Sequence, residues 1–155
     1  MNFFAPPSLK KIPESELQSL LEVHPYLINT NFLNATLEPQ KHLKSGISDL
    51  VFYLNNEIIV VELKIVPLDF EATLQLNGYL EDVKQLFPEK SISGILVGER
   101  PKDKISNLIN TLEFQIEIKN LHEDIPVEIK ICNECRKAIC KTKKKCFFCS
   151  CEEWL

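Results

Sequence analysis

The chain has 155 residues, of which 45% are apolar and 26% charged, with a formal net charge of −4 at pH 7. Such a length suits one domain with a small appendage, and the composition is ordinary for a globular protein. No apolar run approaches the roughly 18 residues of a membrane span, and the N-terminus has no signal-peptide core. We therefore expect a cytoplasmic protein without a membrane partner.

Charge and cysteine are distributed unevenly along the chain. Residues 1–125 hold 11 Lys and Arg against 18 Asp and Glu, a net −7, whereas residues 126–155 hold 7 against 4, a net +3. All six cysteines lie in the second part. We predict a flexible lead-in (1–11), a main domain (12–125) and a tail (126–155). An acidic body with a basic end argues against broad coating of DNA and favours local contact through the tail.

The main domain is predicted to start with a helix over residues 13–24, which Pro25 closes. Proline suits the first helical turn, and Glu14 and Glu16 complement the positive end of the helix dipole. Residues 31–37 are predicted to form an edge strand.

Residues 46–64, GISDLVFYLNNEIIVVELK, predict a β-hairpin that turns at 55–56. Alternation along the two strands then places Asp49 directly opposite Glu62, with Lys64 on the same face. Two carboxylates so close repel each other, and a bound cation would reverse that effect. The alternative is a set of surface charges. However, the second strand is too apolar for a solvated edge, so its charges are costly unless they are used.

A second helix is predicted from about Asp69 to Phe87, where Pro88 ends it. Gln75 and Tyr79 lie four residues apart on one flank and can face the hairpin together. Three further elements are expected: a buried strand at 93–97, an amphipathic helix at 103–112 and a strand at 114–118. The predicted order is α-β-β-β-α-β-α-β.

Asp49 followed by Glu62-Leu63-Lys64 at the end of an apolar strand resembles the signature of PD-(D/E)XK nucleases. Gly46-x-x-Asp49, the same strand and Gln75-x-x-x-Tyr79 resemble, more narrowly, the catalytic domain of the NucS/EndoMS mismatch endonucleases. The similarity spans roughly residues 12–118 and includes the first helix. It implies an α/β fold of the restriction-endonuclease-like kind, a mixed sheet flanked by helices with an α-β-β-β-α-β core.

The resemblance also implies a metal-dependent DNA endonuclease that hydrolyses phosphodiester bonds. Asp49, Glu62 and the Leu63 carbonyl would hold Mg²⁺ or Mn²⁺, which prefer oxygen ligands. Lys64 would assist the attacking water, and the catalytic set would include Gln75 and Tyr79.

A glutamate on the first helix can assist the metal or the water in such nucleases. The family register favours Glu16, Glu14 competes with it, and plain dipole complementarity is the alternative for both. Gly78 stands where these sequences usually carry arginine, so one expected phosphate contact is missing and the same substrate is in doubt.

The tail contains two CxxC pairs separated by ten residues, Cys132/Cys135 and Cys146/Cys149. Four thiolates so spaced predict a small zinc ribbon with a structural Zn²⁺. Cys140 and Cys151 are left over, so the choice among the six thiols stays open. An iron–sulfur cluster is the competing interpretation, and the absence of a cysteine before the nuclease core favours zinc.

A lysine cluster lies just before two phenylalanines in this segment; its members are Lys141, Lys143, Lys144 and Lys145. Cations beside aromatic rings suit contact with a nucleic-acid backbone and base stacking, and a solubilising loop is the alternative.

Two rival functions stay open: an inactive nuclease fold that binds nucleic acid, alone or as a subunit of a repair or defence complex, and an interaction protein with an acidic body. NucS/EndoMS proteins carry an N-terminal dimerisation domain for which this length has no room. The resemblance therefore does not carry over dimerisation, although a homodimer stays open. The sequence does not choose among single-stranded, branched and duplex DNA, or between DNA and RNA.

Overall fold

The computed structural model describes residues 13–101, 104–121, 123–125, 129–131, 133–135, 137–140 and 149. The predicted lead-in at 1–11 and the lysines at 141–145 lie outside these residues.

Helices and strands follow one another in the order α-β-β-β-α-β-α-β, as predicted, and the tail adds two short strands. The elements are α1 (Glu14–Val23), the 3-10 turns η2 (Pro25–Leu27) and η3 (Thr30–Asn34), β1 (Thr36–Leu43), β2 (Gly46–Tyr53), β3 (Glu57–Pro67), α2 (Phe70–Leu86), β4 (Ser91–Glu99), α3 (Ile105–Thr111), β5 (Gln115–Asn120), β6 (Ile129–Ile131) and β7 (Ala138–Cys140). In the described part of the chain, no helix is both long and apolar enough to cross a membrane.

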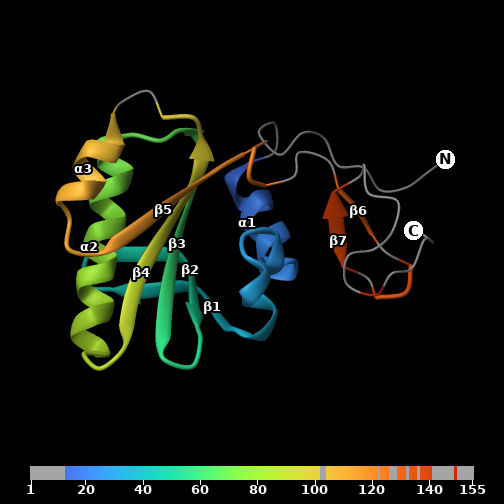
Figure 1. The fold of residues 1–155 in the computed structure, drawn as a ribbon, viewed down its shortest axis with the longest axis horizontal. Coiled ribbons are helices and arrows are strands. Elements are labelled where there is room, and N and C mark those ends of the chain that lie inside the picture. The colour runs from blue at the N-terminus through green and yellow to red at the C-terminus, as the bar shows by residue number, and fades with distance from the viewer. Residues whose placement is uncertain are drawn as a thin grey trace.

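The main sheet has five strands in the order β1-β2-β3-β4-β5. Neighbouring strands are antiparallel from β1 to β3 and parallel from β3 to β5. Figure 1 shows α2 and α3 on one side of this sheet and α1 on the other. The predicted mixed sheet flanked by helices is thus confirmed. Strands β6 and β7 pair in a separate antiparallel sheet.

Strand β3 lies between two apolar layers, one on each face of the sheet. Ile58 and Val60 pack in the layer of α2, whereas Ile59 and Val61 pack in the layer of α1. Burial on both faces explains why this strand reads as a nearly continuous apolar run. Glu62 lies near the end of its buried part, residues 58–63.

The β2–β3 hairpin has the predicted register. The Leu54 N–H donates to the Glu57 carbonyl at 2.9 Å, and the ladder continues inward to the pair Leu50–Val61. Asp49 and Glu62 occupy the next position and therefore face each other.

The strand predicted at residues 31–37 is wrong. Residues 30–34 form η3, and β1 begins only at Thr36. The Asn29 side chain accepts a hydrogen bond from the Asn31 N–H at 2.9 Å and so caps the turn. Phe32 stacks on Phe52 with ring centroids 4.0 Å apart, which fixes the turn on the core. The strand predicted at 93–97 is longer, because parallel pairing with β3 extends over β4.

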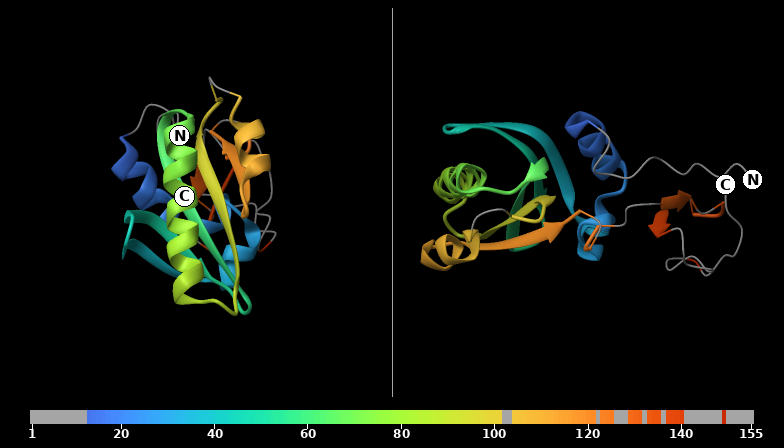
Figure 2. Two further views of the ribbon diagram at one scale, coloured as in Figure 1. Left: turned by 90° about the vertical axis from the view of Figure 1, so that its left-hand side faces the viewer. Right: turned by 90° about the horizontal axis from the view of Figure 1, so that it is seen from above.

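The turn between β1 and β2 docks on α2, and Figure 2 shows this hairpin extending past the helix. The Asp82 carboxylate accepts a hydrogen bond from the Ser45 N–H at 2.7 Å. A Cβ atom at Gly46 would lie 3.0 Å from the Tyr79 hydroxyl, and the φ of Gly46 is +147°. Glycine at this position therefore allows the strand that carries Asp49 to approach α2 closely.

Candidate active site

Asp49 and Glu62 lie within β2 and β3, on the side of the sheet that α2 covers. Glu62 is only 2% exposed, and Asp49 is half-buried. The Asp49 Oδ2 accepts a hydrogen bond from the Leu63 N–H at 2.8 Å. The carboxylate of β2 is therefore held against the backbone of β3, directly beside the Glu62 side chain.

Burial raises the pKa of Glu62 to about 9, helped by a hydrogen bond to the Asp49 carboxyl group and by the charge of Asp49, while Lys64 opposes the shift. Within the described structure, the Glu62 Oε2 is buried without a hydrogen-bond partner. A buried, unpartnered carboxyl oxygen is costly. A cation between the two carboxylates would remove both the repulsion and the unmet acceptor, so this donor pair fits a metal ion.

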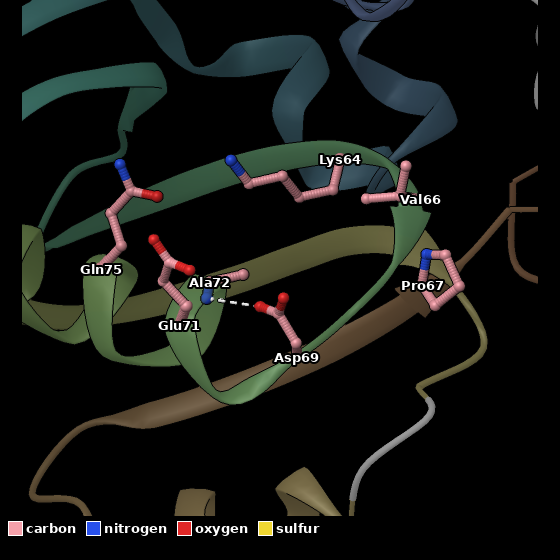
Figure 3. Close-up of a pocket in the computed structure, with 7 residues that line it drawn as sticks. All are labelled: Lys64, Val66, Pro67, Asp69, Glu71, Ala72 and Gln75. Carbon is pink, nitrogen blue, oxygen red and sulfur yellow. Dashed lines mark hydrogen bonds between the residues drawn. The ribbon is translucent and has the colours of Figure 1, made fainter.

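Lys64 extends from β3 over a small open pocket of about 190 Å³, toward Gln75 (Figure 3). The pocket is lined by the β3–α2 connection and the first turns of α2: Lys64, Val66, Pro67, Asp69, Glu71, Ala72 and Gln75. Asp69 caps α2, since its carboxylate accepts from the Ala72 N–H at 2.9 Å. Lys64 is thus the cation of this pocket, and Asp69 serves the helix.

Gln75 and Tyr79 form a short relay from this pocket to β2. The Gln75 Nε2 donates to the Tyr79 hydroxyl at 2.9 Å, and that hydroxyl donates to the Ile47 carbonyl at 3.0 Å. Burial, followed by the charge of Glu62, raises the pKa of Tyr79. The buried Tyr79 therefore ties α2 to the strand two residues before Asp49.

The structure brings Glu14, rather than Glu16, to the carboxylate pair. The pKa of Glu14 is raised, chiefly by burial and also by the charge of Asp49, while the nearby Lys64 opposes the shift. Glu16, in contrast, is exposed. Residues two apart on an α-helix project about 200° apart, so the two glutamates cannot share one direction. Helix periodicity separates them, since Glu14 shares a face with the buried Leu17 and Leu21, but only the packing of α1 on the sheet brings that face to Asp49.

Gln18 is a site residue that the sequence prediction missed. Its Nε2 donates to the Asp49 carbonyl at 3.4 Å. Its spacing of four residues from Glu14 places both on one face of α1, and this was the available signal.

Gly78 packs against the hairpin tip. A Cβ atom there would lie 3.3 Å from the Ser45 Oγ. A side chain at position 78 would therefore begin in close contact with the docked turn.

The described residues contain no group of three or more His, Cys, Asp or Glu side chains that could hold a metal ion. Two carboxylates and a backbone carbonyl nevertheless suit Mg²⁺, which keeps several waters and takes its remaining ligands from substrate phosphates. Of the predicted zinc ligands, Cys135 is half-buried and Cys149 exposed, whereas Cys132 and Cys146 lie outside the described residues.

A protein-family model described as "Endonuclease NucS C-terminal domain" matches residues 13–138. No match was found among curated proteins.

Three solved structures are similar to the chain. An EndoMS–dsDNA2 complex has 22% sequence identity and a TM-score of 0.59, with 70% of this chain and 44% of that chain covered. A repair endonuclease from Pyrococcus abyssi has 22% identity and a TM-score of 0.59, covering 72% and 48%. EndoMS in its apo form has 21% identity and a TM-score of 0.55, covering 71% and 47%. The chain spans just under half the length of these proteins and shares their fold.

Proposed function

We propose that the chain, which belongs to the family of the endonuclease NucS C-terminal domain, is a DNA endonuclease dependent on Mg²⁺ or Mn²⁺. The observation that carries this proposal is the Asp49–Glu62 pair, in which Glu62 presents a buried oxygen without a partner. DNA as the substrate is supported by the similar EndoMS structure, which is a complex with double-stranded DNA.

Asp49 and Glu62 would hold the metal ion through their carboxylates, with the Leu63 carbonyl as a third oxygen. When bound, such an ion supplies an acidified water and neutralises phosphate charge. Asp49 keeps its orientation because its second role, accepting from the Leu63 N–H, anchors the carboxylate beside the ion.

Lys64 would stabilise the negative charge that develops on the phosphoryl oxygens and orient the attacking water. Its position over an open pocket leaves room for a substrate phosphate. Glu14 would accept a hydrogen bond from that water, since its carboxylate is close enough to interact electrostatically with Asp49 and Lys64. We therefore assign to Glu14 the helix-glutamate role for which Glu16 also competed.

Gln75 and Tyr79 would position other groups of the site and would not take part in the chemical step. The relay from Gln75 through the Tyr79 hydroxyl to the Ile47 carbonyl holds β2 on α2. Gln75, at the edge of the pocket of Lys64, can also contact the DNA backbone.

The tail would bind Zn²⁺ through Cys132, Cys135, Cys146 and Cys149 and contact DNA through the lysines at 141–145. The antiparallel pair β6–β7 and the turn at residues 133–135 support this, because a turn between two short strands suits a CxxC pair. Zinc removal by a chelator should unfold residues 127–155 and spare the five-stranded sheet, as measured by amide hydrogen exchange. Loss of protection throughout the main sheet would contradict a separate tail.

The test of the function is cleavage of labelled single-stranded, branched and duplex DNA by the wild type and by Glu62→Ala, each with Mg²⁺, Mn²⁺ or EDTA. Metal-dependent cleavage that the variant lacks is the expected result, and the cleaved DNA names the substrate class. Binding without cleavage under every condition would instead establish a nucleic-acid-binding module. Neither binding nor cleavage would favour a partner-docking subunit.

A further inference from the structure

Gln40, on the edge strand β1, has an unusual backbone. Among the described residues other than glycine, it alone has a positive φ, 52°. The ladder pairs Pro39 with Leu50 and Lys41 with Ser48, so Gln40 stands opposite Asp49 without pairing to it. A left-handed residue is uncommon for glutamine, and here it lies across from the carboxylate that faces Glu62.

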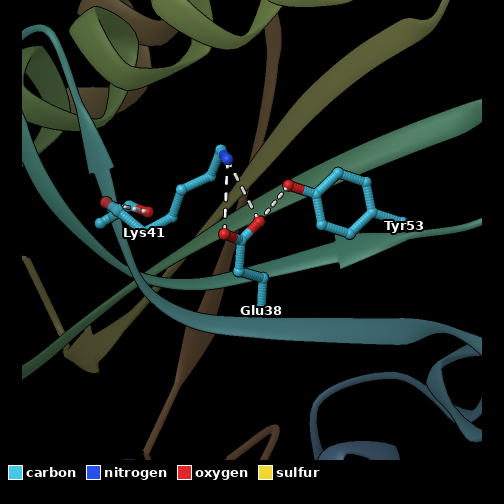
Figure 4. A network of polar contacts seen from close by, with 4 residues as sticks. Glu38, Lys41 and Tyr53 are labelled. Carbon is cyan, nitrogen blue, oxygen red and sulfur yellow. Dashed lines mark hydrogen bonds and ion pairs between the residues drawn. The ribbon is translucent and has the colours of Figure 1, made fainter.

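The contact between Lys41 and Glu38 shows that β1 departs from regular alternation at Gln40. The Lys41 ammonium lies 3.2 Å from the Glu38 carboxylate, although residues three apart on a regular strand point to opposite faces. The Tyr53 hydroxyl donates to the same carboxylate at 2.5 Å, and Figure 4 shows all three groups meeting. The Lys41–Glu38 contact therefore shows that the strand changes the side on which it presents its side chains at Gln40.

Gln18 connects Gln40 to Asp49. The Gln40 Nε2 donates to the Gln18 Oε1 at 2.9 Å. The Gln18 Nε2 in turn donates to the Asp49 carbonyl at 3.4 Å and to Glu22 at 3.1 Å. The Gln18 side chain of α1 thus supplies the Asp49 carbonyl with a hydrogen bond in place of the missing strand pairing with β1.

We propose that Gln40 and Gln18 are positioning residues that set the orientation of the Asp49 carboxylate for metal binding. The inference rests on the proposed function, in which Asp49 is a metal ligand. The backbone of Asp49 is held by Gln18 on one side, and its carboxylate is held by the Leu63 N–H on the other. A residue fixed at both ends keeps one orientation, and structural strain is often retained where it serves a site.

Mn²⁺ binding measured by electron paramagnetic resonance on the full chain tests this inference without relying on activity. Gln40→Gly keeps the backbone conformation but removes the amide, Gln18→Leu removes the bridge from the other side, and Gln40→Val also disfavours a positive φ. We expect the Mn²⁺ dissociation constant to rise by about 10-fold for the first two and toward 100-fold for Gln40→Val, the range for outer-shell partners of metal ligands. In the double variant Gln18→Leu/Gln40→Gly, the two effects should not add, because both remove one bridge.

Gln115→Val is the matched control, since Gln115 is an exposed residue on the opposite edge strand, β5. It should bind Mn²⁺ like the wild type, and circular dichroism should show a native fold for every variant. Wild-type affinity in folded Gln18→Leu and Gln40→Gly, or an equal loss in Gln115→Val, would overturn the inference. Asp49→Ala separates the two levels. If it weakens binding while the glutamine variants do not, only the inference fails. If it leaves binding unchanged, the proposed metal site fails as well.

Discussion

Two glutamates on the same face of the sheet have opposite environments. Glu38 lies opposite Val51 in the ladder, two residues along β2 from Asp49. The Tyr53 hydroxyl, and then Lys41, lowers the pKa of Glu38 despite some burial. Glu62, on β3, has its pKa raised by burial and by Asp49, and one of its oxygens has no hydrogen-bond partner.

The difference separates a carboxylate that has polar partners from one that lacks them. Glu38 lies beside the Tyr53 hydroxyl and the Lys41 ammonium, which favour its ionised form without a bound metal ion. Glu62 faces another carboxylate in the buried part of β3, where burial and Asp49 disfavour its charged form. A fold that supplies partners to one glutamate and withholds them from its neighbour leaves the second available for a ligand.

Removing either carboxylate of the pair should have the largest effect. In Glu62→Ala and Asp49→Ala, metal-dependent cleavage should fall at least about 10³-fold, because a bound metal ion supplies several kcal/mol of transition-state stabilisation. Both proteins should stay folded, since each substitution removes one of two crowded carboxyl groups and leaves the strand pairing of the sheet intact. Cleavage rates and circular dichroism measure the two quantities, and Glu38→Ala serves as the control that keeps activity. Undiminished cleavage in either site variant would contradict the assignment.

Lys64→Met should lower kcat by roughly 10²- to 10³-fold, the usual cost of losing one group that stabilises developing charge. The change keeps an unbranched apolar side chain of similar length and removes the ammonium group. Single-turnover cleavage with saturating metal gives the rate, and Lys41→Met is the matched control beside Glu38. If both lysine variants lost activity equally, the distinction between the two glutamates would not hold.

The free energy of unfolding of the metal-free protein should fall as the pH rises from about 4.5 to about 9. In this window native Glu62 retains a proton that the unfolded chain has lost, so unfolding releases a proton and is favoured by higher pH. At about 1.4 kcal/mol for each pKa unit, the loss across the whole window should be of the order of several kcal/mol. Urea unfolding at several pH values measures it.

Glu62→Gln should flatten this pH dependence, and saturating Mg²⁺ should do the same because it replaces the proton. Glu38→Gln should keep the slope of the wild type. A wild-type stability that rises over the same window would show that Glu62 is ionised in the metal-free protein.

The smallest effect is expected for Glu38→Gln, which removes the charge facing Lys41 and Tyr53. The Glu38 side chain is 45% exposed, and exposed ion pairs contribute no more than about 1 kcal/mol. Thermal unfolding should therefore change little, and Mn²⁺ affinity should not change. A large loss of metal affinity would show that the Glu38–Lys41–Tyr53 contacts belong to the site.

Local patterns were sufficient to predict the centre of the site. Asp49 and Glu62 are joined by one tight hairpin, so alternation and a two-residue turn were enough to set them opposite each other. Helix α2 was predicted nearly to its ends, because Asp69 caps it and Pro88 follows it. These features depend on residues close together in the chain.

Features that depend on packing between distant segments were not predictable. Glu14 reaches the site only because of the way α1 lies on the sheet, and the bridge from Gln40 through Gln18 to Asp49 joins three separate elements. Residues 31–34 were predicted to belong to a strand, yet the Asn29 cap and stacking of Phe32 on Phe52 favour a 3-10 turn. Spacing along the chain carries hairpin register and helix ends, whereas the direction in which an element presents its side chains is set by the core against which it packs.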